Sequence, residues 1–122
     1  MRLHSASHIM EYFLLEHYGP LKRIGSTVDN RKDKSDYIYE GRLMPEDLKA
    51  VENNINQFLS EKHNIIVTKD PEKPNLRIWK CEKLIENCGG THVRNTDEIG
   101  PIRLKRKNTG KGRERVETYL TS

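Results

Sequence analysis

The sequence contains no long apolar run. No stretch approaches the roughly 20 apolar residues that span a bilayer, and the N-terminus lacks the charged-then-apolar order of a secretion signal. Hydrophobic residues make up only 34% of the 122 residues and aromatic residues only 7%, so there is material for one thin core rather than two. We therefore expect one domain over residues 1–122, located in the cytoplasm and without a membrane partner.

Cysteine is equally scarce, because the chain has only Cys81 and Cys88. In a chain without a secretion signal, a single disulfide is the less favoured interpretation. Cys88 is better explained as a buried thiol or as a metal ligand, and Cys81 as a structural or surface residue.

Charged residues, in contrast, make up 33% of the chain, and the formal net charge is +4. Basic side chains gather near the C-terminus, between Arg103 and Arg115, where Glu114 is the single acid. Such a segment suits a phosphate backbone, although basic runs also occur as plain solvated surface.

The hydrophobic periodicity predicts an α+β fold, in which an antiparallel sheet packs with two main helices. We expect helices over residues 4–18 and 45–63, with a short helical stretch at 82–86. We expect strands at residues 22–29, 35–42, 65–68, 76–79, 102–107 and 115–120. The first two strands should form one hairpin and the last two another, with Arg103, Lys105 and Lys107 on one face.

Two pairs of metal-capable side chains stand out, each with a spacing of four. The pairs are His4 with His8 and Cys88 with His92. This spacing puts both members of a pair on one face of a helix or across a tight turn, and zinc accepts all four side chains. Taken singly, the histidines could be polar surface residues, and Cys88 could be a small buried thiol.

The helical pair of histidines does not indicate a zinc protease. That class requires a glutamate directly after the first histidine as general base, and this chain has Ser5 there. The second pair encloses Gly89, Gly90 and Thr91, whose backbone N–H groups can face an anionic intermediate. The alternative for Gly89 and Gly90 is an ordinary glycine turn.

The two motifs together resemble a known family. His4-Ser-Ala-Ser-His8 and Cys88-Gly-Gly-Thr-His92-Val-Arg-Asn-Thr96-Asp-Glu98-Ile-Gly100 are similar to the editing domain of alanyl-tRNA synthetase and its stand-alone relatives, within the threonyl and alanyl tRNA synthetase second additional domain. The resemblance extends over nearly the whole chain.

The resemblance implies a zinc-binding domain with a specific activity. It implies zinc ligation by His4, His8, Cys88 and His92, and hydrolysis of mischarged alanine tRNA that carries serine, with glycine as a second candidate. Four protein ligands describe a closed zinc site. We therefore expect zinc to organise the ester and the water, while Gly89, Gly90 and Thr91 shape the side that stabilises the anion.

Substrate contacts are expected at two further places. The resemblance points to the strand with Arg23, Ser26 and Thr27 for selectivity, although relatives often have glutamine or threonine where Arg23 stands. The basic residues Arg103, Lys105 and Lys107 are the candidate platform for the tRNA acceptor end.

Two alternatives stay open. The chain resembles the shortest, free-standing editing proteins that act in trans, and Met1 argues against a fragment of a longer enzyme. A zinc-stabilised RNA-binding module without catalysis would explain the ligand set and the basic segment equally well. The oligomeric state is not predicted.

Overall fold

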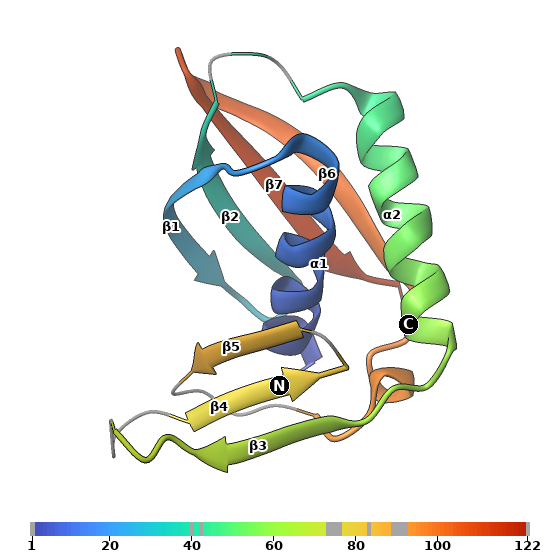
Figure 1. Cartoon of the computed structure of the whole chain (residues 1–122). Coiled ribbons are helices and arrows are strands. Elements are labelled where there is room, and N and C mark those ends of the chain that lie inside the picture. The colour runs from blue at the N-terminus through green and yellow to red at the C-terminus, as the bar shows by residue number, and fades with distance from the viewer. Residues whose placement is uncertain are drawn as a thin grey trace.

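A four-stranded antiparallel sheet forms the larger layer of the fold in the computed structural model. The structure describes residues 2–39, 41, 43–72, 77–82, 84–88 and 93–121, with residues 86–88 as backbone only. The sheet has the strand order β1-β2-β7-β6, made of β1 (Lys22–Val28), β2 (Lys32–Ile38), β6 (Ile102–Gly110) and β7 (Arg113–Leu120). Helices α1 (Arg2–Tyr18) and α2 (Pro45–Ser60) lie on one face of this sheet (Figure 1).

Helix α1 forms as its apolar spacing predicts. The buried residues of its main stripe include Ala6, Ile9, Met10 and Leu14, which pack against α2 and the sheet. The helix ends before Gly19, which has a φ of 82° and donates its N–H to the Leu15 carbonyl oxygen at 2.8 Å. A left-handed glycine is a common end for a helix.

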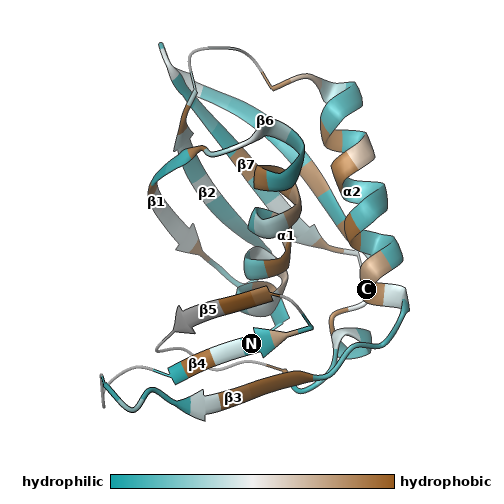
Figure 2. Ribbon diagram, in the orientation of Figure 1, coloured by the Kyte–Doolittle hydropathy of each residue, from teal (hydrophilic) through white to brown (hydrophobic). Residues whose placement is uncertain are grey.

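Helix α2 begins at Pro45 with two acids in its first turn, as predicted, but ends at Ser60 rather than near His63. Its buried side is fastened to the end of the large sheet by Asn56. The Asn56 side chain donates to the Ile102 carbonyl oxygen at 3.0 Å and accepts the Ile102 N–H at 2.8 Å. Apolar bands recur along both helices between hydrophilic ones (Figure 2).

The first hairpin is tighter than predicted. Strand β2 begins at Lys32 and ends at Ile38, whereas the expected strand was 35–42. The Asp29 carboxylate explains the early start, since it accepts the N–H groups of Arg31 at 2.7 Å and Lys32 at 2.9 Å. Such a side-chain turn is typical of aspartate, and it leaves the following residues free to pair with β1.

A second, three-stranded sheet holds β3 (Ile65–Lys69), β4 (Arg77–Cys81) and β5 (Leu84–Cys88). The prediction of a short helix at 82–86 is wrong, because the chain turns at Glu82, with a φ of 54°, and returns as β5. The prediction of one sheet is likewise corrected to two antiparallel sheets. The α+β class with two main helices is confirmed.

One face of the small sheet closes the core. Ile65, Cys81 and Leu84 occupy one buried row across the three strands, and the neighbouring Trp79 is fully buried. Cys81 is a free thiol, and it pairs with Leu84 while Cys88 pairs with Arg77 at the other end of the ladder. This separation explains why the two cysteines do not form a disulfide.

The segment after the glycine motif is held by its own polar side chains. The 3-10 helix η1 (Thr96–Glu98) has a capping box in which Asn95 accepts the Asp97 N–H and Glu98 accepts the Asn95 N–H. The buried Thr96 hydroxyl donates to the Leu59 carbonyl oxygen at 3.1 Å. Gly100 follows with a φ of 73°, a conformation that favours glycine. No helix in the described part of the chain is long and apolar enough to cross a membrane.

Glu114 provides a first test of the core. Its carboxylate is fully buried and accepts hydrogen bonds from Arg106 at 2.7 and 3.2 Å, from the Leu43 N–H at 3.0 Å and from Asn108 at 2.9 Å. Burial alone would raise the pKa of Glu114, but these donors outweigh it and hold the pKa below its ordinary value.

We predict that Arg106→Met lowers the free energy of unfolding by about 3 kcal/mol, because it leaves a buried carboxylate without its main partner. The stability that Glu114 contributes is present above its unfolded pKa and is lost as the pH falls through the folded one. Denaturant unfolding between pH 7 and pH 3 should therefore show a weaker loss of stability in Glu114→Gln than in the wild type. Parallel curves for the two proteins would contradict this account.

Candidate functional site

Helix α1 places His4 and His8 side by side. Their ring centroids are 4.9 Å apart with an interplanar angle of 32°. The ring of His8 also lies 5.1 Å from the ring of Trp79 on β4. The two histidines therefore occupy the angle between the large sheet and the small one, beside the main apolar stripe of the helix.

The second motif returns to the same place. Val93, which directly follows His92, donates its N–H to the buried Ser5 hydroxyl at 3.4 Å, and Ser5 directly follows His4. At the other end of the motif, Cys88 is the last residue of β5, a strand that packs against α1. The residue after the Cys88–His92 segment is thus tied to the part of α1 that carries the histidines.

Not all predicted ligands are described. The predicted residues Gly89, Gly90, Thr91 and His92 lie outside the described residues, as does the side chain of Cys88. Within the described part, no three His, Cys, Asp or Glu side chains form a metal cluster. The donor set of three imidazoles and one thiolate suits zinc. The Val93 to Ser5 bond brings the residue after His92 to the residue after His4, which is compatible with a shared metal.

A buried carboxylate lies behind the histidines. The Asp33 Oδ2 atom accepts hydrogen bonds from Ser7 at 3.0 Å and from Ser35 at 2.8 Å. Burial raises the pKa of Asp33, and those two bonds and the nearby charges of Arg23 and His4 lower it only in part.

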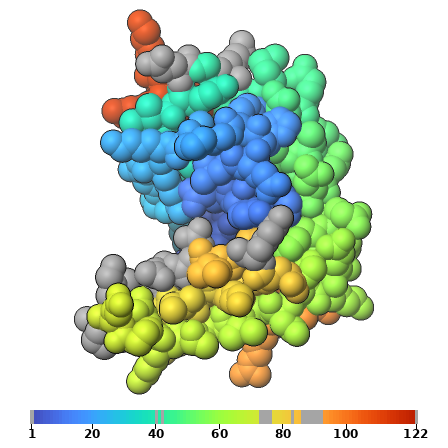
Figure 3. All heavy atoms as spheres, viewed as in Figure 1, coloured from blue at the N-terminus to red at the C-terminus, as the bar shows by residue number. Residues whose placement is uncertain are grey.

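A hollow of about 620 Å³ opens beside His4. Its walls come from the start of α1, the β1–β2 turn and the segment after His92, and include Val28, Asn30, Val93 and Glu98. Hollows of this size take small ligands. The molecular surface is also recessed between the β1 side of the large sheet and the small sheet (Figure 3).

The predicted selectivity residues on β1 divide between two faces. Arg23 pairs with Tyr37 and Ser26 pairs with Ser35, and both partners are buried toward α1. Thr27 pairs with Lys34 instead, so it lies on the opposite face. Arg23 and Ser26 are thus on the side of the histidines, whereas Thr27 is not.

Arg23 is held by Glu11, a residue that the sequence analysis did not single out. Glu11 accepts a hydrogen bond from Arg23 at 3.4 Å and from the Tyr37 hydroxyl at 3.1 Å. Burial and the adjacent Glu11 raise the pKa of Tyr37 well above its ordinary value, so the phenol stays protonated as the donor. Glu11 lies three positions after His8, and residues three apart lie on the same face of a helix. This position could have been predicted from the sequence.

The basic residues Arg103, Lys105 and Lys107 share one face of β6, as predicted, but that face points away from the histidines. Their partners on β7 are Tyr119, Glu117 and Arg115, whereas α1 packs on the alternate face with Val116 and Thr118. We call the side of the large sheet that carries Arg103, Lys105 and Lys107 the outer face. The structure therefore does not bring this predicted platform together with the predicted ligands.

Comparison with known proteins agrees with the two motifs. Residues 76–117 match the family model of the Threonyl and Alanyl tRNA synthetase second additional domain. The chain is 31% identical over 127 residues to the alanyl-tRNA editing protein AlaX-M of Pyrococcus horikoshii, covering 98% of this chain and 56% of that protein. Both findings support membership of this family.

The chain is also similar to a part of two alanine–tRNA ligases. The chain is 27% identical over 138 residues to the ligase of Campylobacter jejuni subsp. doylei, which covers 98% of the chain and 16% of the ligase. For the ligase of Thermoanaerobacter sp. strain X514 the identity is 28% over 135 residues, or 95% of the chain and 15% of the ligase. The chain thus spans about half the length of AlaX-M and about a sixth of the ligases.

The family match includes the second motif but not the first. Residues 76–117 contain β4, β5, η1, β6 and most of β7. The first motif of this second additional domain, on α1, lies in the part that aligns with AlaX-M. The family predicted from the sequence is confirmed.

The Glu11 contacts give a second test. In this second additional domain, we predict that Tyr37→Phe lowers the free energy of unfolding by about 1.5 kcal/mol, because the Tyr37 hydroxyl is a buried donor to a carboxylate. Arg23→Met should lower it by less than about 1 kcal/mol, since the Arg23 side chain is 32% exposed and its ion pair is screened by water. Urea unfolding of both variants measures the difference, and the reverse order would contradict it.

Proposed function

We propose that this chain is an editing hydrolase that deacylates alanine tRNA mischarged with serine, with glycine as a second substrate. The Val93 to Ser5 hydrogen bond is the observation that carries the proposal. It joins the two motifs typical of the family at one end of α1, beside a hollow large enough for an aminoacylated ribose. The similarity to the editing protein AlaX-M supports the same activity.

The reaction is an ester hydrolysis. The oxygen of a water forms a bond to the carbonyl carbon, the bond from that carbon to the ribose oxygen breaks, and a proton passes to the ribose oxygen. Such a second site is needed because an alanine pocket cannot exclude the smaller glycine and cannot fully reject serine. The chain must therefore bind the wrong product and hold its ester in a reactive position.

The ligand residues would be His4, His8, Cys88 and His92. Zinc held there would supply a fixed positive charge that organises the ester and the attacking water. The Asp33 carboxylate behind α1, held by Ser7 and Ser35, would support the position of the histidine rings.

The remaining roles are proposed for the other residues that the sequence singled out. Backbone N–H groups of Gly89, Gly90 and Thr91 would donate to the oxyanion of the tetrahedral intermediate. On the β1 side, Ser26 can donate to or accept from a serine hydroxyl. Arg23, neutralised by Glu11, would form the charged border of that pocket.

A matched pair of histidine variants tests the proposal. His8→Ala should reduce release of serine from mischarged alanine tRNA about 100-fold, because the ester loses its position, and should reduce the zinc content measured on the same sample. His17→Ala is the control, since His17 lies on the same helix but pairs with Asp47 on α2. It should keep full activity and zinc content.

Two results would reject parts of the proposal. Full activity of a folded, metal-free His8→Ala protein would remove zinc from the mechanism. Binding of tRNA without release of serine by the wild type would leave the second candidate, an RNA-binding module without catalysis, which the basic outer face favours.

A further inference from the structure

The outer face of the large sheet carries a concentration of positive charge that the deacylation site does not use. The cross-strand register places its central basic side chains on β2, β6 and β7. They are Lys32, Lys34, Arg103, Lys105, Lys107 and Arg115. The acids interspersed among them are Asp36 and Glu117.

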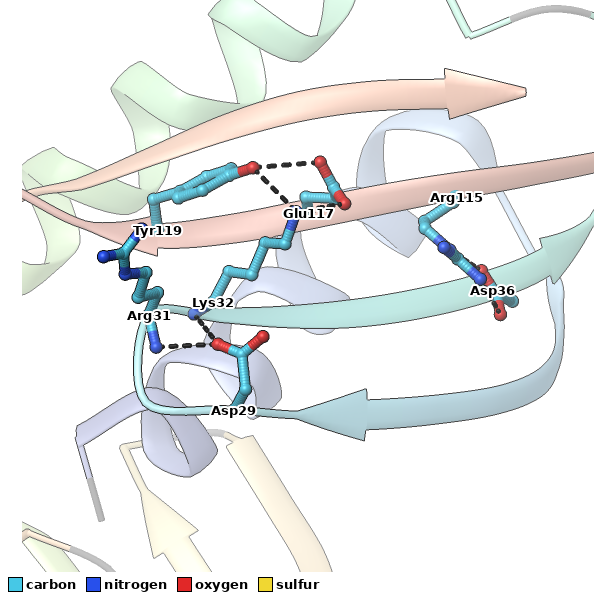
Figure 4. A network of polar contacts seen from close by, with 7 residues as sticks. All are labelled: Asp29, Arg31, Lys32, Asp36, Arg115, Glu117 and Tyr119. Carbon is cyan, nitrogen blue, oxygen red and sulfur yellow. Dashed lines mark hydrogen bonds and ion pairs between the residues drawn. The ribbon is translucent and has the colours of Figure 1, made fainter. Parts of the chain in front are cut away.

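Both acids are already neutralised within the sheet. Asp36 accepts two hydrogen bonds from Arg115, at 2.6 and 3.2 Å, and Glu117 accepts from Lys32 at 2.9 Å (Figure 4). Arg103, Lys105 and Lys107 are exposed and form no ion pair with any carboxylate that the structure describes. The outer face thus keeps an excess of positive charge.

One pair of these basic side chains is unfavourably placed across the ladder. Lys107 lies directly opposite Arg115 in the ladder, and like charges in this position destabilise a sheet. Along β6, basic side chains recur at every second residue, about 7 Å apart. A row of this kind suits a row of phosphates, which would relieve the repulsion.

The aromatic side chain on this face indicates which part of a nucleic acid it would contact. The Tyr119 ring has the Lys105 ammonium 5.1 Å and the Lys32 ammonium 5.4 Å from its centroid, and its hydroxyl donates to Glu117. A ring engaged by two ammonium groups positions cations rather than stacking on a base. The contacts would therefore be to the backbone and independent of base sequence.

We propose that the outer face binds the phosphate backbone of tRNA at a place beyond the acceptor end. This rests on the proposed function for the identity of the RNA. The outer face and the hollow beside His4 meet at the β1–β2 turn, where Asn30 lines the hollow and Lys32 begins the outer face. One tRNA can therefore extend from the hollow, past the turn, onto the basic surface.

Charge reversal at Lys107 tests the proposal with little risk to the fold. Lys107→Glu puts an acid opposite Arg115, a favourable cross-strand pair. Lys80→Glu is the matched control, since Lys80 is an exposed strand residue of the small sheet and the change in net charge is identical. Affinity for uncharged alanine tRNA is measured from 50 to 200 mM salt.

The expected result is a loss of affinity confined to Lys107→Glu. It should bind at least about threefold more weakly at low salt, and the log–log salt slope should fall by about one. Lys80→Glu should bind as the wild type does. Deacylation of a short serine-charged acceptor-stem hairpin should be the same in Lys80→Glu and the wild type.

The outcomes separate this proposal from the proposed function. Equal tRNA affinity for Lys107→Glu and the wild type overturns the outer-face proposal. An equal loss of tRNA affinity in Lys80→Glu also overturns it. So does binding of polyglutamate by the wild type as tightly as tRNA. If no protein releases serine but Lys107→Glu alone loses affinity, the outer-face proposal stands and the deacylase is rejected. If serine is released but Lys107→Glu binds tRNA as tightly as the wild type, the deacylase stands and the outer-face proposal is rejected.

Discussion

Helix α1 packs on three partners at once, and the rest of the structure depends on that packing. One side meets α2, another meets β2 and β7 of the large sheet, and a third lies against β5 of the small sheet. Little of its first half is left for solvent, and Ser5 and Ser7 are buried there together with the apolar residues. The angle between the two sheets remains, and His4 and His8 occupy it.

The buried serines show how this packing serves the site. Ser7 holds the Asp33 carboxylate and Ser5 holds the backbone of Val93. Each bond connects the turn of α1 between the two histidines with a segment that is distant in the sequence. A buried hydroxyl with a partner costs little, and here it connects the helix to β2 and to the second motif.

The spacing of apolar and charged residues correctly predicted those features that depend on neighbours in the sequence. The two helices, the last hairpin and the face shared by Arg103, Lys105 and Lys107 follow from spacing along the chain, and the structure contains them. Residues 82–86 were misassigned to a helix because this charged stretch has helical character, while pairing with β4 makes residues 84–88 a strand. The sides taken by Arg23 and Thr27 depend on the register with β2, which no local pattern reveals.

The same limit applies to the site. The spacing of the motifs predicted which residues to bring together, and Glu11 could have been found by its position on the histidine face of the helix. Asp33 could not, because a turn aspartate and a buried one look alike in sequence. Nor could the sequence say that the basic hairpin faces away from His4, since that depends on which side of the sheet the helices cover.

Because side chains alternate along each strand, the large sheet has one face that packs on the helices and an opposite face that carries the basic residues. On β7, Glu114, Val116 and Thr118 face the helices, whereas Arg115, Glu117 and Tyr119 face outward. A charge added to the outer face does not alter the core, because its neighbours along the strand point the other way. The opposed Lys107 and Arg115 are tolerated for this reason: their repulsion is exposed to water and salt, while the packing that positions His4 and His8 lies beneath the sheet.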